Sequence, residues 1–285
     1  MELGAEVFKT RNGTPYLKEP GVVLIAKPNT YVYAIGEFLD GFDSGLEFSK
    51  YLDDDWTADD GDCLCKVAGQ LCYMSFGPKR TGNDRMEEYL NHIKESGHGS
   101  VFEHANYSFL FYGISRSLTH ELVRHRAGFA FSQVSQRYVD GSKLRFVERP
   151  EFQNDELLHI YFERSIDEIA QQYETVAQEL MRRQKSGEEI LSAEAKTDLR
   201  KKVNQCARAI LPNYTEAPII VTANARAWRH FLEMRGSVGA EVEIRRLAVK
   251  VLHTFQEEKL LIFSDYSLEA LSDGTQGIVT RYRKV

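Results

Sequence analysis

Long apolar runs are missing from this sequence. No stretch of about 18 apolar residues occurs, so the sequence predicts no membrane-spanning helix. Residues 1–10 include acidic side chains and no apolar run, which is unlike a secretory signal. We therefore expect a cytoplasmic protein with no membrane partner.

Cysteine is also scarce, and its spacing is not that of a metal site. The chain has 4 cysteines, three of them within residues 63–72, and no CxxC pair occurs. Ordinary core or surface thiols in a reducing compartment are the favoured interpretation. His98, Glu103 and His104 have side chains that can bind metals, but no further ligand lies at a zinc-site spacing. We therefore expect no metal.

Positive charge is not in excess. The chain has 36 Lys and Arg against 42 Asp and Glu, which gives a formal net charge of −6. Proteins bind DNA and RNA largely by neutralising phosphates with Lys and Arg. The composition therefore disfavours a nucleic-acid-binding module, and we expect no nucleic-acid partner. Any anionic ligand must be held by a local cluster of cations.

Two familiar catalytic motifs are absent. The sequence contains no G-x-G-x-x-G segment, so it does not predict a nicotinamide-binding Rossmann unit. It also lacks the G-x-S-x-G elbow of many serine hydrolases. This absence disfavours a hydrolase, and it favours Ser135 as a substrate-binding hydroxyl rather than a nucleophile.

Apolar periodicity predicts strands early in the chain and helices late. Strands are predicted at residues 21–26, 105–112, 134–139 and 144–147. Apolar residues in steps of three and four predict helices around residues 86–93, 117–124, 166–180, 199–210, 224–234 and 244–255. The predicted fold class is therefore α+β, with an antiparallel or mixed sheet packed with several long helices.

The strongest chemical signal is a basic cluster in residues 124–138, RHRAGFAFSQVSQRY. Arg124, His125 and Arg126 are consecutive, and Arg137 follows a polar stretch. The planar fork of an arginine matches phosphate oxygens, and Ser and Gln side chains add donors and acceptors for a phosphate or a base edge. From the residues alone, an anion-binding site and an exposed basic turn are both open.

Two further arginines lie within apolar runs. Arg208 belongs to CARAILP, and Arg235 follows FLEM. Arginine is rarely buried without a partner. Each of the two is therefore expected either to pair with an acid or to face a ligand.

The order of these segments resembles a known family. Arg-His-Arg, a spacer and Ser-Gln-Arg-Tyr resemble the signature of the flavin-dependent thymidylate synthases. Companion segments at residues 97–104, 207–212 and 224–235 follow in the family's order. There are two departures: the spacer is one residue longer than in many members, and Glu121 and His230 stand where amides are often expected.

The resemblance implies a reaction, an assembly and a domain organisation. The reaction is the reductive methylation of dUMP to dTMP, with 5,10-methylenetetrahydrofolate as carbon donor and FAD, reduced by NADPH, as hydride donor. The implied assembly is a homotetramer whose active sites are shared between chains. Residues 61–285 would form the catalytic domain, and residues 1–60 an N-terminal extension of unpredicted packing. Another FAD-dependent nucleotide-modifying enzyme is the alternative.

The resemblance also implies roles for residues at matching positions. Arg235 is expected at the uracil ring, as a cation that stabilises developing negative charge. Contacts with FAD are expected from Ser75, Ser100, Glu103, Arg124, His125, Arg126, Gln133, Asn224, Arg226 and His230. Contacts with dUMP are expected from Glu121, Arg124, Gln133, Ser135, Gln136, Arg137, Arg208 and Arg235.

Overall fold

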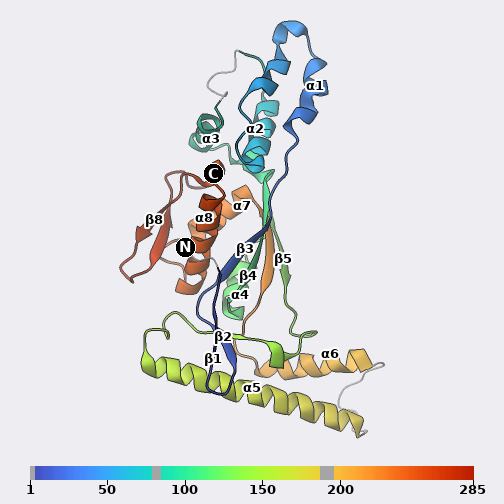
Figure 1. Cartoon of the computed structure of the whole chain (residues 1–285), viewed down its shortest axis with the longest axis vertical. Helices are drawn as coiled ribbons and strands as arrows, with labels where there is room; N and C mark the ends of the chain where they lie inside the picture. Colours follow the sequence, from blue (N-terminus) through green and yellow to red (C-terminus); the bar gives the residue numbers. More distant parts are fainter. Residues whose placement is uncertain (1–3, 79–84, 187–195) are drawn as a thin grey trace.

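A four-stranded antiparallel sheet runs through the middle of the molecule (Figure 1). The structure is a computed structural model that describes residues 4–78, 85–186 and 196–285. The strand order is β3 (Gly21–Ala26), β4 (Asn106–Tyr112), β7 (Ile219–Asn224) and β5 (Phe129–Gln133). β7 therefore pairs on both sides, with β4 and with β5.

The alternation of side chains along the strands directs one face of this sheet into the core. In β4 the side chains of Tyr107, Phe109 and Phe111 are fully buried, and the residues between them are half-buried. Successive side chains of a strand point to opposite faces, so this pattern marks one fully covered face. The helices α7 (Ala225–Arg235) and α8 (Val242–Glu257) pack beside the sheet (Figure 1).

Further elements extend the two ends of the sheet (Figure 1). The upper end carries α1 (Gly36–Asp40), α2 (Asp60–Cys72) and α3 (Met86–Glu95). The lower end carries α5 (Glu156–Lys185), α6 (Lys196–Ala207) and a small sheet of β1 (Val7–Lys9), β2 (Pro15–Leu17) and β6 (Phe146–Val147). The remaining elements are α4 (Arg116–Leu122), the hairpin β8 (Ser267–Ala270) and β9 (Gln276–Val279), and the 3-10 helices η1 (Val32–Ile35), η2 (Ser44–Leu46), η3 (Phe48–Asp53), η4 (Gly99–Glu103), η5 (Gly141–Lys143), η6 (Arg208–Ile210) and η7 (Leu261–Phe263).

The predicted fold class is confirmed, and one predicted strand is wrong. Residues 134–139 form a turn, and the strand beside them is β5, at residues 129–133. The carbonyl of Ser135 accepts hydrogen bonds from the backbone N–H groups of Tyr138 and Val139, at 3.1 and 3.0 Å. These local bonds, together with one from Arg137 N–H to Ser135 Oγ, compete with strand pairing despite favourable residue types.

The first 60 residues are partly integrated into the sheets. β3 pairs antiparallel with β4, and β2 pairs parallel with β6. A domain boundary near residue 60 remains a prediction. Within the three described ranges, no helix is both long and apolar enough to span a membrane.

The indole of Trp228 on α7 is the centre of an aromatic layer between helix and sheet. It is fully buried and lies edge-on to the rings of Phe109, Phe129 and Phe231, with centroids 5.1–5.6 Å away. Such ring pairs add to the free energy of simple burial.

We predict that Trp228→Ala lowers the free energy of unfolding by about 3–5 kcal/mol, because a large buried ring is lost. Tyr31→Ala is the control, since the Tyr31 side chain is 75% exposed; its effect should stay within about 0.5 kcal/mol. Guanidinium-induced unfolding measures both. Equal effects of the two substitutions would contradict this account of the core.

Candidate active site

β7 leads directly into α7, and this connection positions the residues of the candidate site. The side-chain oxygen of Asn224 accepts a hydrogen bond from Ala227 N–H at 2.8 Å and so caps the helix. The helix buries Trp228 on the sheet side. Arg226, His230 and Glu233 follow at spacings of four and three, so they share another face of the helix.

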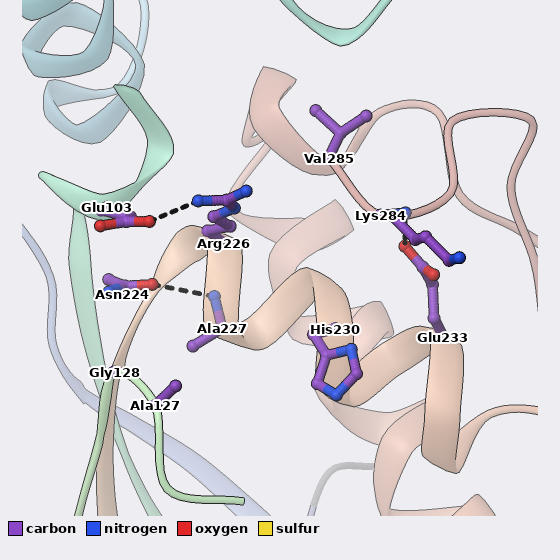
Figure 2. A pocket seen from close by; sticks show the side chains of 10 residues that line it. All are labelled: Glu103, Ala127, Gly128, Asn224, Arg226, Ala227, His230, Glu233, Lys284 and Val285. Atoms are coloured by element: carbon purple, nitrogen blue, oxygen red, sulfur yellow. Dashed lines mark hydrogen bonds and ion pairs between the residues drawn. The ribbon is translucent and has the colours of Figure 1, made fainter. Parts of the chain in front are cut away.

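A pocket of about 370 Å³ lies against this face of α7 (Figure 2). Four of the residues that were predicted to bind FAD line it, from η4, from the end of β7 and from α7. The pocket is lined by Glu103, Ala127, Gly128, Asn224, Arg226, Ala227, His230, Glu233, Lys284 and Val285. We call it the first pocket.

A second pocket, of about 240 Å³, adjoins the first. Ala127 and His230 line both. The second pocket is lined by Arg124, His125, Arg126, Ala127, Phe129, His230, Met234 and Arg235. The fold therefore brings the predicted Arg-His-Arg motif and the predicted catalytic arginine together, directly beside the first pocket.

The first pocket contains an ion pair that a ligand can displace at little cost. Arg226 Nη1 lies 2.6 Å from Glu103 Oε1, and the two side chains are 42% and 51% exposed. Exposed ion pairs contribute little to stability. Arg124 and Arg126 are also exposed, and within the described parts of the chain neither side chain forms an ion pair. Three cations are therefore accessible to an anionic ligand.

Arg235 is held in place by two acceptors. Its Nη1 donates to Glu121 Oε2 at 2.5 Å, and its Nε donates to His125 Nε2 at 2.9 Å. Its Nη2 lies 3.4 Å from the carbonyl oxygen of Glu121. A guanidinium has five N–H donors, so it keeps free donors after these bonds. The result is a fixed cation beside the second pocket.

The charge states of the two acceptors are set by their surroundings. Burial, with help from the charges of Arg235 and His230, lowers the pKa of His125 to about 4. His125 is therefore neutral at pH 7, which leaves its Nε2 lone pair available to Arg235. Burial raises the pKa of Glu121, as does the nearby carboxyl of Glu241, and the cation of Arg235 opposes this shift.

The residues predicted to bind dUMP fall into two groups. Arg124 and Arg235 line the second pocket, and Glu121 is bonded to Arg235. The other five lie toward the far end of β5: Gln133, Ser135, Gln136, Arg137 and Arg208. Gln133 ends the strand, and its Nε2 donates to Thr119 Oγ1 at 3.3 Å. Arg137 Nε donates to Gln205 Oε1 on α6 at 3.1 Å, and Arg208 follows α6 directly. β5 has 5 residues, which makes it roughly 15 Å long. Figure 1 shows β5 running between the α7 end of the sheet and α6.

Comparison with known proteins decides the family. Residues 55–259 match the family described as "Thymidylate synthase complementing protein". The chain belongs to this family. Proteins named "Flavin-dependent thymidylate synthase" are similar to it: one from Mycolicibacterium gilvum, 42% identical over 232 residues (81% of this chain and 90% of the relative), and one from Mycobacterium tuberculosis, 43% identical over 224 residues (78% and 86%). The resemblance seen in the sequence is confirmed.

Three residues predicted to bind FAD lie outside both pockets of this family member. Ser75 follows α2, with its backbone N–H bonded to the carbonyl of Gln70, and Ser100 is an exposed residue of η4. The third is Gln133 at the end of β5, and none of the three lines the first or the second pocket. Ser135 and Gln136 lie in the turn after β5. In the described residues, no group of three or more His, Cys, Asp and Glu is placed to hold a metal ion.

Six residues that line the first pocket of this family member were not among the predicted site residues: Ala127, Gly128, Ala227, Glu233, Lys284 and Val285. Glu233 had a usable signal, because it shares a helical face with Arg226 and His230. Lys284 and Val285 had none, since they reach the pocket from a distant part of the chain.

We predict a pH-dependent loss of stability that depends on His125. The folded-state pKa of about 4 is lower than the ordinary value of 6.5, so the unfolded chain takes up the proton first as the pH falls. The free energy of unfolding should therefore decline between pH 6.5 and pH 4. In His125→Gln the decline should be shallower, because glutamine keeps an acceptor but does not titrate. Urea unfolding at several pH values measures this free energy. If it declines equally in the two proteins, His125 is not the cause of the pH dependence.

Proposed function

We propose that this chain is a flavin-dependent thymidylate synthase. It converts dUMP to dTMP, with 5,10-methylenetetrahydrofolate as carbon donor and NADPH as the source of the hydride, which FAD delivers. One observation carries the proposal: the pocket lined by predicted FAD residues adjoins the pocket that contains Arg235. A cofactor and a fixed cation that act on one substrate must lie side by side.

The residues present fit FAD, a long anionic ligand. Two adjoining pockets suit a molecule with several parts, and Arg124 and Arg126 supply charges for its phosphates. Gly128 has φ +75°, and a Cβ there would lie 2.7 Å from Asn224 Nδ2, so the backbone passes close to the start of α7. When bound, FAD supplies hydride transfer, and the protein positions the reacting atoms.

Arg235 would act on the uracil ring of dUMP as a fixed cation. Its guanidinium stays protonated, so it cannot be a general base. Glu121 and His125 fix its orientation before substrate binds, and a preorganised charge costs no rearrangement during the reaction. Stabilising negative charge on the ring makes C5 of uracil more nucleophilic without a cysteine adduct.

We predict that Arg235→Ala lowers kcat by roughly 100- to 1,000-fold, the usual effect of losing one preorganised contact. FAD should remain bound, because this substitution leaves the lining of the first pocket and the exposed Arg124 and Arg126 in place. The assay is formation of dTMP from dUMP, methylenetetrahydrofolate and NADPH, with flavin content measured by absorbance. Full turnover by this variant would remove Arg235 from the mechanism. A natural chain that binds FAD but makes no dTMP would point to the alternative, another FAD-dependent nucleotide-modifying enzyme.

The proposal includes a homotetramer with active sites shared between chains. The separation within one chain supports it: Arg137 and Arg208, which would bind the phosphate of dUMP, lie across the length of β5 from Arg235. One nucleotide cannot reach both ends of that strand. A site that combines Arg235 of one chain with Arg208 of another removes the difficulty.

Hybrid enzymes test the sharing. We predict that Arg208→Ala and Arg235→Ala are each nearly inactive, and that co-expressed mixtures of the two regain roughly a quarter of the natural activity. Random pairing gives that fraction, because one site in four then receives both natural arginines. Mixing the two proteins without subunit exchange is the control. If co-expression restores nothing, both arginines serve a site within one chain.

A further inference from the structure

Two residues near the end of the described chain form part of the wall of the first pocket. Lys284 and Val285 line it together with the predicted FAD residues (Figure 2). The match to the family ends at residue 259, so this wall lies outside the matched segment. We propose that residues 280–285, here called the wall segment, are a further part of the FAD site. The inference rests on the proposed function.

The first half of the wall segment is anchored to the protein core. Thr280 Oγ1 donates to Asp265 Oδ2 at 2.5 Å, and the carbonyl of Tyr282 accepts from Arg229 Nη2 at 3.2 Å. Arg229 is fully buried and paired with Asp265 at 2.7 Å. The hydroxyl of Tyr282 also donates to Glu95 Oε1 at 2.9 Å. The buried pair thus fixes where the wall segment leaves the core.

The second half is fixed against the pocket itself. Lys284 N–H donates to Glu233 Oε1 on α7 at 3.0 Å. Lys284 has φ +64°, in the left-handed region that residues other than glycine seldom adopt. Such a conformation persists where surrounding contacts hold it. Glu233 supplies one such contact, from the face of α7 that lines the pocket.

Val285 completes the wall by packing onto η4. Its side chain is buried, and a Cβ added to Gly99 would lie 2.5 Å from the carbonyl carbon of Val285. The absence of a side chain at Gly99 therefore admits the backbone of Val285. Figure 2 shows Val285 and Lys284 across the pocket from Ala127 and Asn224. The wall segment thus lines the pocket from outside the matched segment, and FAD bound there would contact residues of both.

A matched pair of substitutions at Lys284 tests the role of the wall segment. Lys284→Pro and Lys284→Ala both remove the ammonium group. Only proline also removes the N–H that Glu233 accepts, and its ring fixes φ near −65°. We expect Lys284→Pro to raise the dissociation constant of FAD roughly tenfold, whereas Lys284→Ala stays close to the natural protein. Equilibrium dialysis of the flavin-loaded protein measures this constant, and thermal unfolding checks the fold.

A chain shortened after Tyr282 provides the second test, since it lacks Lys284 and Val285 but keeps the anchors at Asp265 and Arg229. Weaker FAD binding with an unchanged melting temperature would support the proposal. FAD binding as tight as in the full chain would overturn it. If the shortened chain is also less stable, the FAD dissociation constants of Lys284→Pro and Lys284→Ala decide whether the wall segment contributes to binding. A natural chain that binds no FAD would instead refute the proposed function itself.

Discussion

The cap of helix α7 by Asn224 is the interaction on which the site depends. β7 is paired on both sides, so the position of its last residue is set by two neighbouring strands. Asn224 ends that strand and starts the helix, with its side-chain oxygen on Ala227 N–H. The rotation of α7 is thereby fixed: Trp228 enters the core, and Arg226 and His230 face the pockets. A shift of the cap would move every one of these side chains.

Electrostatics follow from the same arrangement. The chain is acidic overall, with a formal net charge of −6. Arg226 nevertheless lies at the start of α7 and Arg235 at its end, and Arg124 and Arg126 line the same pocket as Arg235. Arg235 is balanced by Glu121, and burial keeps His125 neutral, so one guanidinium keeps its orientation. Arg124 and Arg126 remain exposed. In the proposed function, Arg235 would supply fixed charge at the reacting ring, and Arg124 and Arg126 would supply accessible charge for phosphates.

The site was predictable from the sequence where its residues lie close together in the chain. The consecutive Arg124, His125 and Arg126 line one pocket. The periodic helices and the strand at residues 21–26 were equally clear. Residues 134–139 were not, because the hydrogen bonds that Ser135 makes outweigh strand propensity.

Long-range contacts explain what the sequence did not predict. The approach of Val285 to Gly99 joins residues far apart in the chain, and no local pattern marks it. The bonds that hold Arg235 likewise join α7 to α4 and to the loop after it. The contact between Arg235 and Glu121 depends on the pairing of the strands, because the sheet sets the distance between α7 and α4.

The central claim is that FAD and dUMP meet in one site, where the bound nucleotide affects reduction of the flavin. The most direct measurement is the flavin absorbance of the purified protein under anaerobic conditions, after addition of NADPH with and without dUMP. The account predicts that the flavin band bleaches, and bleaches faster when dUMP is present. A protein that takes up no FAD, or whose flavin reacts at the same rate with and without dUMP, would contradict it.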